Sequence, residues 1–176
     1  MKKLSMVELN RISVNDFKSA EKIPLVVVLD NIRSLNNIGS VFRTSDAFRV
    51  QSIYLCGITG TPPNKEIHKT ALGATESVDW QYFENTEDAV RELQSRKFRV
   101  YAVEQASGSV MLDNFTVEAN MPIAVVFGNE VNGVREDVMT LVDGCIEIPQ
   151  FGTKHSFNIA VSAGIVLWEL FKFYHK

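Results

Sequence analysis

The chain has 176 residues, of which 45% are hydrophobic and 22% are charged, and this suits one domain with a single buried core. Its formal net charge of −3 argues against a nucleic-acid-binding protein that relies on bulk positive charge. No run of about eighteen apolar residues predicts a membrane span, and no apolar signal core follows the first residues, so we expect a cytoplasmic protein.

The charges are unevenly distributed along the sequence. Residues 1–75 hold ten Lys and Arg against six Asp and Glu, residues 76–146 hold five against thirteen, and residues 147–176 hold three against two. If the two ends of the chain meet in the fold, they form a basic face opposite an acidic one. That asymmetry is compatible with an RNA partner but does not require one.

The cysteines and histidines predict neither a disulfide nor a metal site. Cys56 and Cys145 each lie in an apolar run, which indicates buried thiols in a reducing compartment. His68, His155 and His175 are scattered without the spacing of zinc ligands, so we expect no metal.

The predicted elements alternate along the chain. Residues 1–23 read as an N-terminal helical lead-in, with apolar residues at roughly helical spacing: Met6, Leu9, Ile12 and Phe17. Within 24–176, taken as one domain, apolar runs of the kind that a strand buried on both faces needs lie at 25–29, 52–56, 98–103, 122–127 and 144–148. Helical patterns cover 37–48, 65–74, 86–96, 135–142 and 158–173, and long loops lie at about 57–64 and 104–121. This alternation predicts an α/β fold with a mainly parallel sheet and helices on both faces.

Helix starts are marked less clearly than strands. Thr86, followed by two acids, has the character of a helix-capping residue. On the residues alone, a capping role is also the better interpretation of Asn37, and small polar residues such as Ser156 and Asn158 commonly cap.

Three loops that follow predicted strands are rich in polar residues and glycine: 30–39, 128–133 and 149–158. In open α/β sheets, ligands bind at the carboxyl ends of the strands, so these loops form the candidate site. The sequence contains neither the G-x-G-x-x-G of a dinucleotide site nor the G-x-x-x-x-G-K-[ST] of a P-loop, and it has no G-x-S-x-G hydrolase elbow.

Residues 37–44, 128–133, and 148–152 with 156–162 resemble, in that order, the three motifs of the SpoU (TrmH-like) branch of the SPOUT superfamily of RNA ribose 2′-O-methyltransferases. The resemblance spans about residues 25–173. It implies a C-terminal deep trefoil knot, S-adenosyl-L-methionine as cofactor, and a homodimer whose active site takes residues from both subunits. The implied substrate is tRNA, of the D-loop guanosine type, or else rRNA. Phe157 departs from the Ser-Leu-Asn usual in the third motif, which puts the shape of the adenine pocket in doubt.

The resemblance also implies roles for individual residues. The catalytic set is Arg43, Asn37, Glu130, Ser156 and Asn158. Arg43 is expected to fix a phosphate and stabilise the developing alkoxide rather than to act as a base, because a guanidinium hardly deprotonates. Glu130 is expected to order the cofactor loop and to hold Arg43. The alternative for Arg43 is an ordinary surface arginine, and for Glu130 an exposed loop acid.

Two further sets of residues complete the expected site. The resemblance implies that the cofactor is bound by Gly128, Asn129, Gly133, Ile148, Gly152, Phe157 and Asn158. A protein with net negative charge needs a local patch for RNA, and we expect it to be drawn from Arg11, Arg33, Lys65, Lys69 and Lys154.

The last predicted helix has more apolar positions than one packing face needs, which favours a dimer, although burial within one subunit is the alternative. Two functions from other classes stay open on the sequence. One is a non-catalytic RNA-binding knot protein, and the other is a nucleotide-binding regulatory α/β domain.

Overall fold

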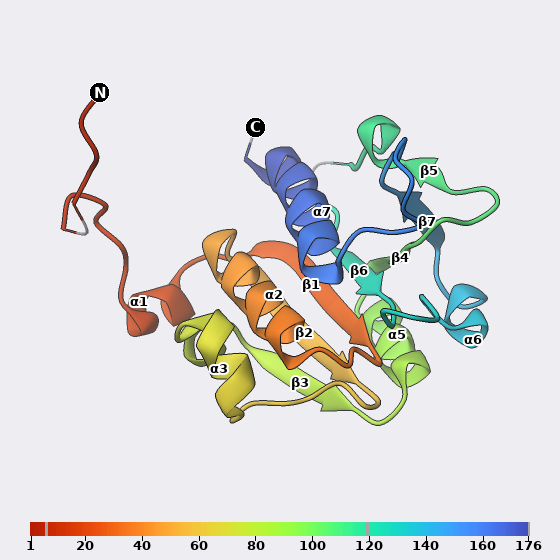
Figure 1. Cartoon of the computed structure of the whole chain (residues 1–176), viewed down its shortest axis with the longest axis horizontal. Helices are drawn as coiled ribbons and strands as arrows, with labels where there is room; N and C mark the ends of the chain where they lie inside the picture. Colours follow the sequence, from red (N-terminus) through yellow and green to blue (C-terminus); the bar gives the residue numbers. More distant parts are fainter. Residues whose placement is uncertain (6, 119, 176) are drawn as a thin grey trace.

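The fold is known from a computed structural model, which describes residues 1–5, 7–118 and 120–175. Its strands are β1 (Ile23–Asp30), β2 (Val50–Cys56), β3 (Trp80–Phe83), β4 (Arg99–Val103), β5 (Val110–Met111), β6 (Ile123–Phe127) and β7 (Gly144–Glu147). They form one sheet in the order β3-β2-β1-β6-β4-β7-β5, in which every neighbouring pair is parallel. The predicted α/β class with a mainly parallel sheet is confirmed (Figure 1).

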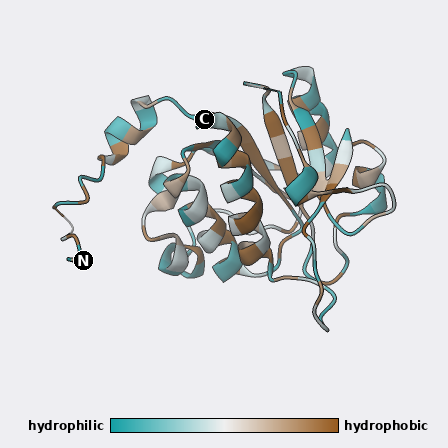
Figure 2. Ribbon diagram, turned by 90° about the horizontal axis from the view of Figure 1, so that it is seen from above, coloured by the Kyte–Doolittle hydropathy of each residue, from teal (hydrophilic) through white to brown (hydrophobic). Residues whose placement is uncertain are grey.

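Helices cover both faces of the sheet. One face packs against α2 (Leu35–Ala47), α3 (Lys65–Ala71), α4 (Ala74–Ser77) and α7 (Ile159–Tyr174). The other packs against α5 (Thr86–Ser95) and α6 (Glu136–Met139). Successive side chains of a strand point to opposite faces, so Val27 of β1 belongs to the first core and Val28 to the second. Figure 2 shows the strongest hydrophobic colouring in the central strands and in the helices beside them.

The N-terminal segment is less helical than its pattern predicts. The helix α1 covers only Val14–Ser19 and begins after Ser13, whose side chain accepts a hydrogen bond from the N–H of Asp16. Of the expected apolar positions, Phe17 is buried while Leu9 and Ile12 are exposed, and Met6 lies outside the described residues. The segment before α1 extends away from the body (Figure 1), so Phe17 is the residue of the expected apolar stripe that anchors it.

Several boundaries also differ from the prediction. The helix expected over 65–74 is divided into α3 and α4, because Leu72 and Gly73 both adopt left-handed backbone conformations. Asn85, not Thr86, holds the N-cap position of α5, and the buried Thr86 hydroxyl bonds to Asp30 instead. The loop expected over 104–121 contains β5 and a short 3₁₀ turn, Leu112–Asn114.

Both thiols are free. Cys56 is fully buried, and burial raises its pKa to about 12, whereas Cys145 is half-buried and has its pKa raised for the same main reason. In the described part of the chain, no helix is long and apolar enough to cross a membrane, and no group of three or more His, Cys, Asp or Glu residues is placed to hold a metal ion.

Candidate active site

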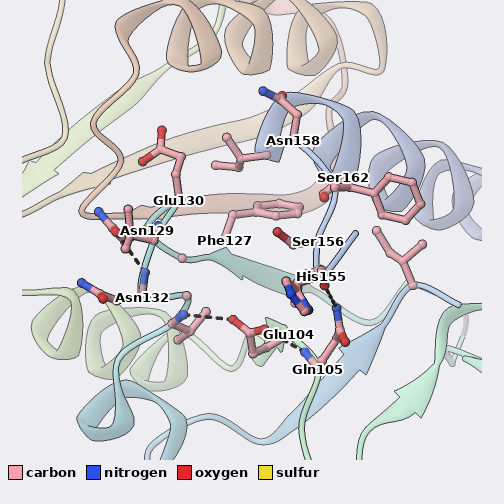
Figure 3. A pocket seen from close by; sticks show the side chains of 18 of the residues that line it. Glu104, Gln105, Phe127, Asn129, Glu130, Asn132, His155, Ser156, Asn158 and Ser162 are labelled. Carbon is pink, nitrogen blue, oxygen red and sulfur yellow. Dashed lines mark hydrogen bonds between the residues drawn. The ribbon is translucent and has the colours of Figure 1, made fainter. Parts of the chain in front are cut away.

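The three polar loops meet at the carboxyl ends of β1, β6 and β7, as the parallel sheet requires. There the loops after β6 and β7 border a cavity of about 710 Å³, lined by residues from 103–105, 127–134 and 148–162. The loop after β1 is joined to them by hydrogen bonds and does not itself line the cavity. Figure 3 shows the side chains of these segments converging on the cavity from β6, from the loop after it and from the start of α7. A cavity of this size lies within the usual range for small-molecule sites.

The loop after β6 is a tight turn closed on itself. Asn129 and Gly133 exchange two backbone hydrogen bonds of 3.0 and 2.9 Å, and the side-chain oxygen of Asn129 accepts from the N–H groups of Val131 and Asn132. Gly133 has a φ of 66°, and a Cβ on Gly128 would lie 2.1 Å from the backbone of Gly133. Both glycines are therefore needed for the loop to take this shape beside the cavity.

Glu130 joins that loop to the start of α2. Its carboxylate accepts hydrogen bonds from the N–H groups of Arg33 and Ser34, each at 3.0 Å, and from the side-chain amide of Asn37 at 3.4 Å. Burial by itself raises the pKa of Glu130, but the donors from Arg33, Ser34 and Asn37 outweigh it and lower the pKa below its ordinary value. The carboxylate is thus held in its charged form at the positive end of a helix.

The interpretation of Asn37 as a helix cap is wrong. Ser34 is the N-cap of α2, and its side chain accepts from the N–H of Asn37, which lies in the first turn. The side chain of Asn37 is consequently available to the site. It donates to Glu130 and accepts from the side-chain amide of Asn158 at 3.2 Å.

Asn158 both caps α7 and belongs to this network. Its side-chain oxygen accepts from the N–H of Ala160 at 2.9 Å while its amide donates to Asn37. A continuous series of hydrogen bonds therefore runs from Glu130 through Asn37 to Asn158 and links all three loops. Ser156 lines the same cavity and is exposed, without a capping bond.

Arg43 lies outside this network. It projects from α2, is exposed and does not line the cavity, and its side chain forms no hydrogen bond or ion pair within the described residues. The expected contact between Glu130 and Arg43 is not formed, because the carboxylate is taken up by the first turn of α2.

Most of the residues expected to bind the cofactor line the cavity: Gly128, Asn129, Gly133, Ile148, Phe157 and Asn158. Gly152 does not line it and lies in the exposed part of the loop before α7. The apolar side chains and the backbone of the glycine turn fit a ligand with an aromatic base, and the polar residues at the mouth fit its charged end. The residues present therefore suit an adenosine-containing cofactor.

Among the cavity residues that the sequence interpretation did not assign to the site are Glu104, Gln105 and Ser162. The carboxyl group of Glu104 accepts from the N–H of Val134 at 3.2 Å and from the N–H of Gln105 at 2.9 Å, and the Gln105 amide donates to the carbonyl of His155. Glu104 and Gln105 directly follow a predicted strand, so the rule that ligands bind at strand ends could have identified them.

The residues expected to contact RNA come from separate segments. Arg11 lies on the N-terminal segment, Arg33 before α2, Lys65 and Lys69 on α3, and Lys154 in the loop before α7. Lys69 is paired with Glu66 at 2.7 Å, an exposed contact worth little in water.

The chain is similar in sequence to known RNA methyltransferases. The sequence model of the SpoU rRNA Methylase family matches residues 24–168. A tRNA (guanosine(18)-2′-O)-methyltransferase of Thermus thermophilus is 34% identical over 145 residues, which cover 82% of this chain and 73% of that protein. A 23S rRNA (guanosine-2′-O-)-methyltransferase of Vibrio parahaemolyticus is 31% identical over 162 residues, covering 92% of this chain and 64% of that protein.

Solved structures give the same result for the fold. An AdoMet-bound rRNA methyltransferase from Sinorhizobium meliloti superposes with a TM-score of 0.78 at 28% identity, over 87% of this chain and 58% of that one. The A. aeolicus TrmH/SpoU tRNA modifying enzyme superposes with a TM-score of 0.79 at 26% identity, over 91% of this chain and 81% of that one.

Proposed function

The chain belongs to the SpoU rRNA methylase family, and we propose that it transfers the methyl group of S-adenosylmethionine to a ribose 2′-hydroxyl of tRNA or rRNA. Membership assigns it an RNA methyltransferase activity with S-adenosylmethionine as the cofactor. The observation that carries the proposal is the series Glu130–Asn37–Asn158, because it joins one residue from each motif beside the cavity.

Different residues of the chain have different roles in the proposed reaction. The turn from Gly128 to Gly133, with Ile148 and Phe157, holds the cofactor, which supplies a methyl group already activated on its sulfonium. Ser156 and Asn158 lie at the mouth of the cavity, where they align the acceptor ribose. Arg43 fixes a phosphate of the RNA and offsets the negative charge that develops on the 2′-oxygen.

Glu130 is a positioning group rather than a base in this proposal. Three donors stabilise its charged form, and its lowered pKa makes it a weak proton acceptor at neutral pH. The proton of the 2′-hydroxyl leaves through a phosphate or a water molecule. We propose no metal for this reaction, since the acceptor needs only alignment and charge compensation.

The preferred substrate is a D-loop guanosine of tRNA, with rRNA as the second candidate. The Thermus thermophilus relative, named for guanosine 18 of tRNA, supports the first. The Vibrio parahaemolyticus relative, named for 23S rRNA, supports the second. We place the reaction in the cytoplasm, with residues 24–176 as the methyltransferase domain and residues 1–23 as its N-terminal segment.

We further propose that the C-terminal part of the chain is knotted. The strand β7 lies between β4 and β5, although β5 directly follows β4 along the chain. The segment that leaves β4 therefore crosses β7 to form β5 before it returns to β6. Threading of residues 148–158 through that segment on the way to α7 is the knot that the family resemblance implies.

A homodimer is part of the same proposal. Val161 and Trp168 on α7 are 50% and 52% exposed, and the Trp168 ring lies 5.9 Å from that of Phe48 at the end of α2. An apolar surface across α2 and α7 favours contact with a second copy of the chain. That copy would bring its own residues to the cavity, which Arg43 of the same chain does not line. Light scattering at micromolar concentration should give twice the mass of one chain, and a monomer mass would contradict this part.

Two measurements test the function. Calorimetry should detect binding of S-adenosylmethionine and S-adenosylhomocysteine but not of NAD or ATP, and binding of NAD alone would instead favour a nucleotide-binding regulatory domain. Ribose methylation mapped on total RNA from cells with and without the gene should reveal one lost 2′-O-methyl group. Cofactor binding with no lost methylation and no turnover would favour a non-catalytic RNA-binding protein.

A further inference from the structure

A buried acid with no part in the proposed chemistry contacts the end of the loop that borders the cavity. Asp30 is the last residue of β1, the third strand of the sheet order, and is 0% exposed. We propose that Asp30 is a positioning residue, which fixes the cofactor loop at residues 128–135 to β1 and thereby places Glu130. The inference rests on the proposed function and adds to it a residue outside the three motifs.

The contacts of Asp30 come from three different parts of the chain. Its Oδ1 accepts from the side-chain amide of Asn31 at 2.7 Å and from the hydroxyl of Thr86 at 2.5 Å. Its Oδ2 accepts from the N–H of Arg135 at 3.4 Å, at the long end for a hydrogen bond. Thr86 begins α5 and Arg135 is the N-cap of α6, so both helices on this face begin at the same acid.

The cofactor loop is joined at three places to the last residue of β1 and to the segment after it. Glu130 accepts from the start of α2, the side-chain amide of Asn129 donates to the carbonyl of Asn31 at 2.7 Å, and the N–H of Arg135 donates to Asp30. Glu130 is exposed, whereas Asp30 is the fully buried contact of the three. The burial of Asp30 shields its side of this part-buried bond from water, so Asp30 anchors the end of the loop.

The side chain of Arg135 closes this cluster into a ring. Its guanidinium pairs with the carboxylate of Glu87, the residue after Thr86. The start of α5 thus contacts Asp30 through Thr86 and Arg135 through Glu87, while Arg135 contacts Asp30 through its backbone. The arrangement holds the C-terminal end of the cofactor loop between β1 and α5.

The neighbours of Asp30 make Asp30→Asn a selective change. The Asn31 amide cannot turn over without loss, because its oxygen accepts from the N–H of Ile58 at 3.1 Å. An asparagine at position 30 must therefore keep its oxygen toward Asn31 and Thr86 and direct its NH₂ group at the N–H of Arg135. Two donors then face each other, and the part-buried N–H of Arg135 loses its acceptor.

The matched control is Asp46→Asn. Asp46 on α2 accepts a hydrogen bond from the largely buried hydroxyl of Ser77 on α4. Its replacement therefore also disturbs a carboxylate–hydroxyl contact. This contact lies on the opposite face of the sheet, away from residues 128–135.

We expect Asp30→Asn to speed amide hydrogen exchange of residues 129–134 about tenfold and to weaken S-adenosylhomocysteine binding about five- to tenfold. Asp46→Asn should leave both unchanged.

A second pair of variants keeps the test decisive if Asp30→Asn does not fold. Thr86→Val has nearly the shape of threonine but removes the hydroxyl that donates to Asp30, whereas Thr86→Ser retains it. Thr86→Val should speed exchange of 129–134, and Thr86→Ser should restore the slower exchange. Exchange rates of 129–134 equal in Thr86→Val and wild type would overturn the inference. Failure of the wild type to bind S-adenosylhomocysteine would instead overturn the proposed function, because the exchange measurement needs no cofactor.

Discussion

The cofactor side and the acceptor side of the cavity differ in how far the chain itself fixes them. On the cofactor side, Asn129 and Glu130 both have hydrogen-bond partners within the chain. On the acceptor side, Arg33 and Arg43 are exposed, and their guanidinium groups have no hydrogen-bond or ion-pair partner in the ranges that the structure describes. In the proposed function, contacts within the chain thus fix the cofactor side, and another molecule, either RNA or a second subunit, completes the acceptor side.

This difference has a physical reason. Side chains that must hold a small ligand in one geometry act best when their own bonds have already fixed them. Long cationic side chains that meet a phosphate backbone gain from remaining adaptable until the RNA is present. Substitutions on the acceptor side and on the cofactor side of the cavity should therefore have different effects.

The largest effect is expected at Arg43. Arg43→Lys keeps the positive charge but removes the planar group that can hold a phosphate and the ribose oxygen together, so we expect methyl transfer to fall by about a hundredfold or more. Cofactor affinity should stay within a few fold, because Arg43 does not line the cavity. Single-turnover methylation and calorimetry measure the two effects.

The control for this change is Arg49→Lys, at an exposed arginine just after α2. It should leave both turnover and cofactor affinity unchanged. If Arg43→Lys keeps its turnover, Arg43 is a surface residue with no catalytic role. If Arg43→Lys loses cofactor binding, Arg43 supports the cofactor side of the cavity instead.

A smaller effect is expected on RNA binding. Replacing Arg11, Arg33, Lys65, Lys69 and Lys154 by glutamine should weaken RNA binding about tenfold to a hundredfold and make the affinity less dependent on salt, because fewer counterions are released. Filter binding at several salt concentrations measures both. Neutralising Arg91 and Lys97, which belong to the α5 side of the sheet, is the control. Equal losses from both sets would show that these five positions form no specific surface.

Two of the strands that the sequence predicted have an especially clear pattern. The strands β1 and β6 are continuous runs of apolar residues, and they are buried on both faces of the sheet. The strand β3 was missed because Gln81 and Tyr82 are exposed at the sheet edge and break the apolar run, and β5 has only two residues. The position of β7 between β4 and β5 could not be predicted, since strand order depends on contacts between distant residues.

The candidate site shows the same limit. Family resemblance brought Asn37, Glu130 and Asn158 together, whereas local patterns gave Asn37 a capping role that Ser34 performs. Asp30 was not singled out, because an acid after an apolar strand looks like the start of a solvated loop. Its burial becomes evident only when α5 and the loop after β6 are placed beside it.

The smallest effect is expected at Glu130, on the cofactor side. Glu130→Gln keeps the shape but replaces one acceptor oxygen with an NH₂ group, so one of the N–H groups of Arg33 and Ser34 loses its partner.

Because the folded protein lowers the pKa of the Glu130 carboxyl below its ordinary value of 4.5, the charged form stabilises the fold. That contribution is fully present above pH 4.5 and is lost as the pH falls below it. Glu130 is exposed, so solvent limits the contribution to about 1 kcal/mol. Urea unfolding should show that Glu130→Gln is less stable than wild type at pH 7 and that the difference narrows toward pH 3, with turnover reduced several fold at neutral pH. A stability difference that is constant from pH 7 to pH 3 would mean that the carboxylate does not hold the cofactor loop against α2.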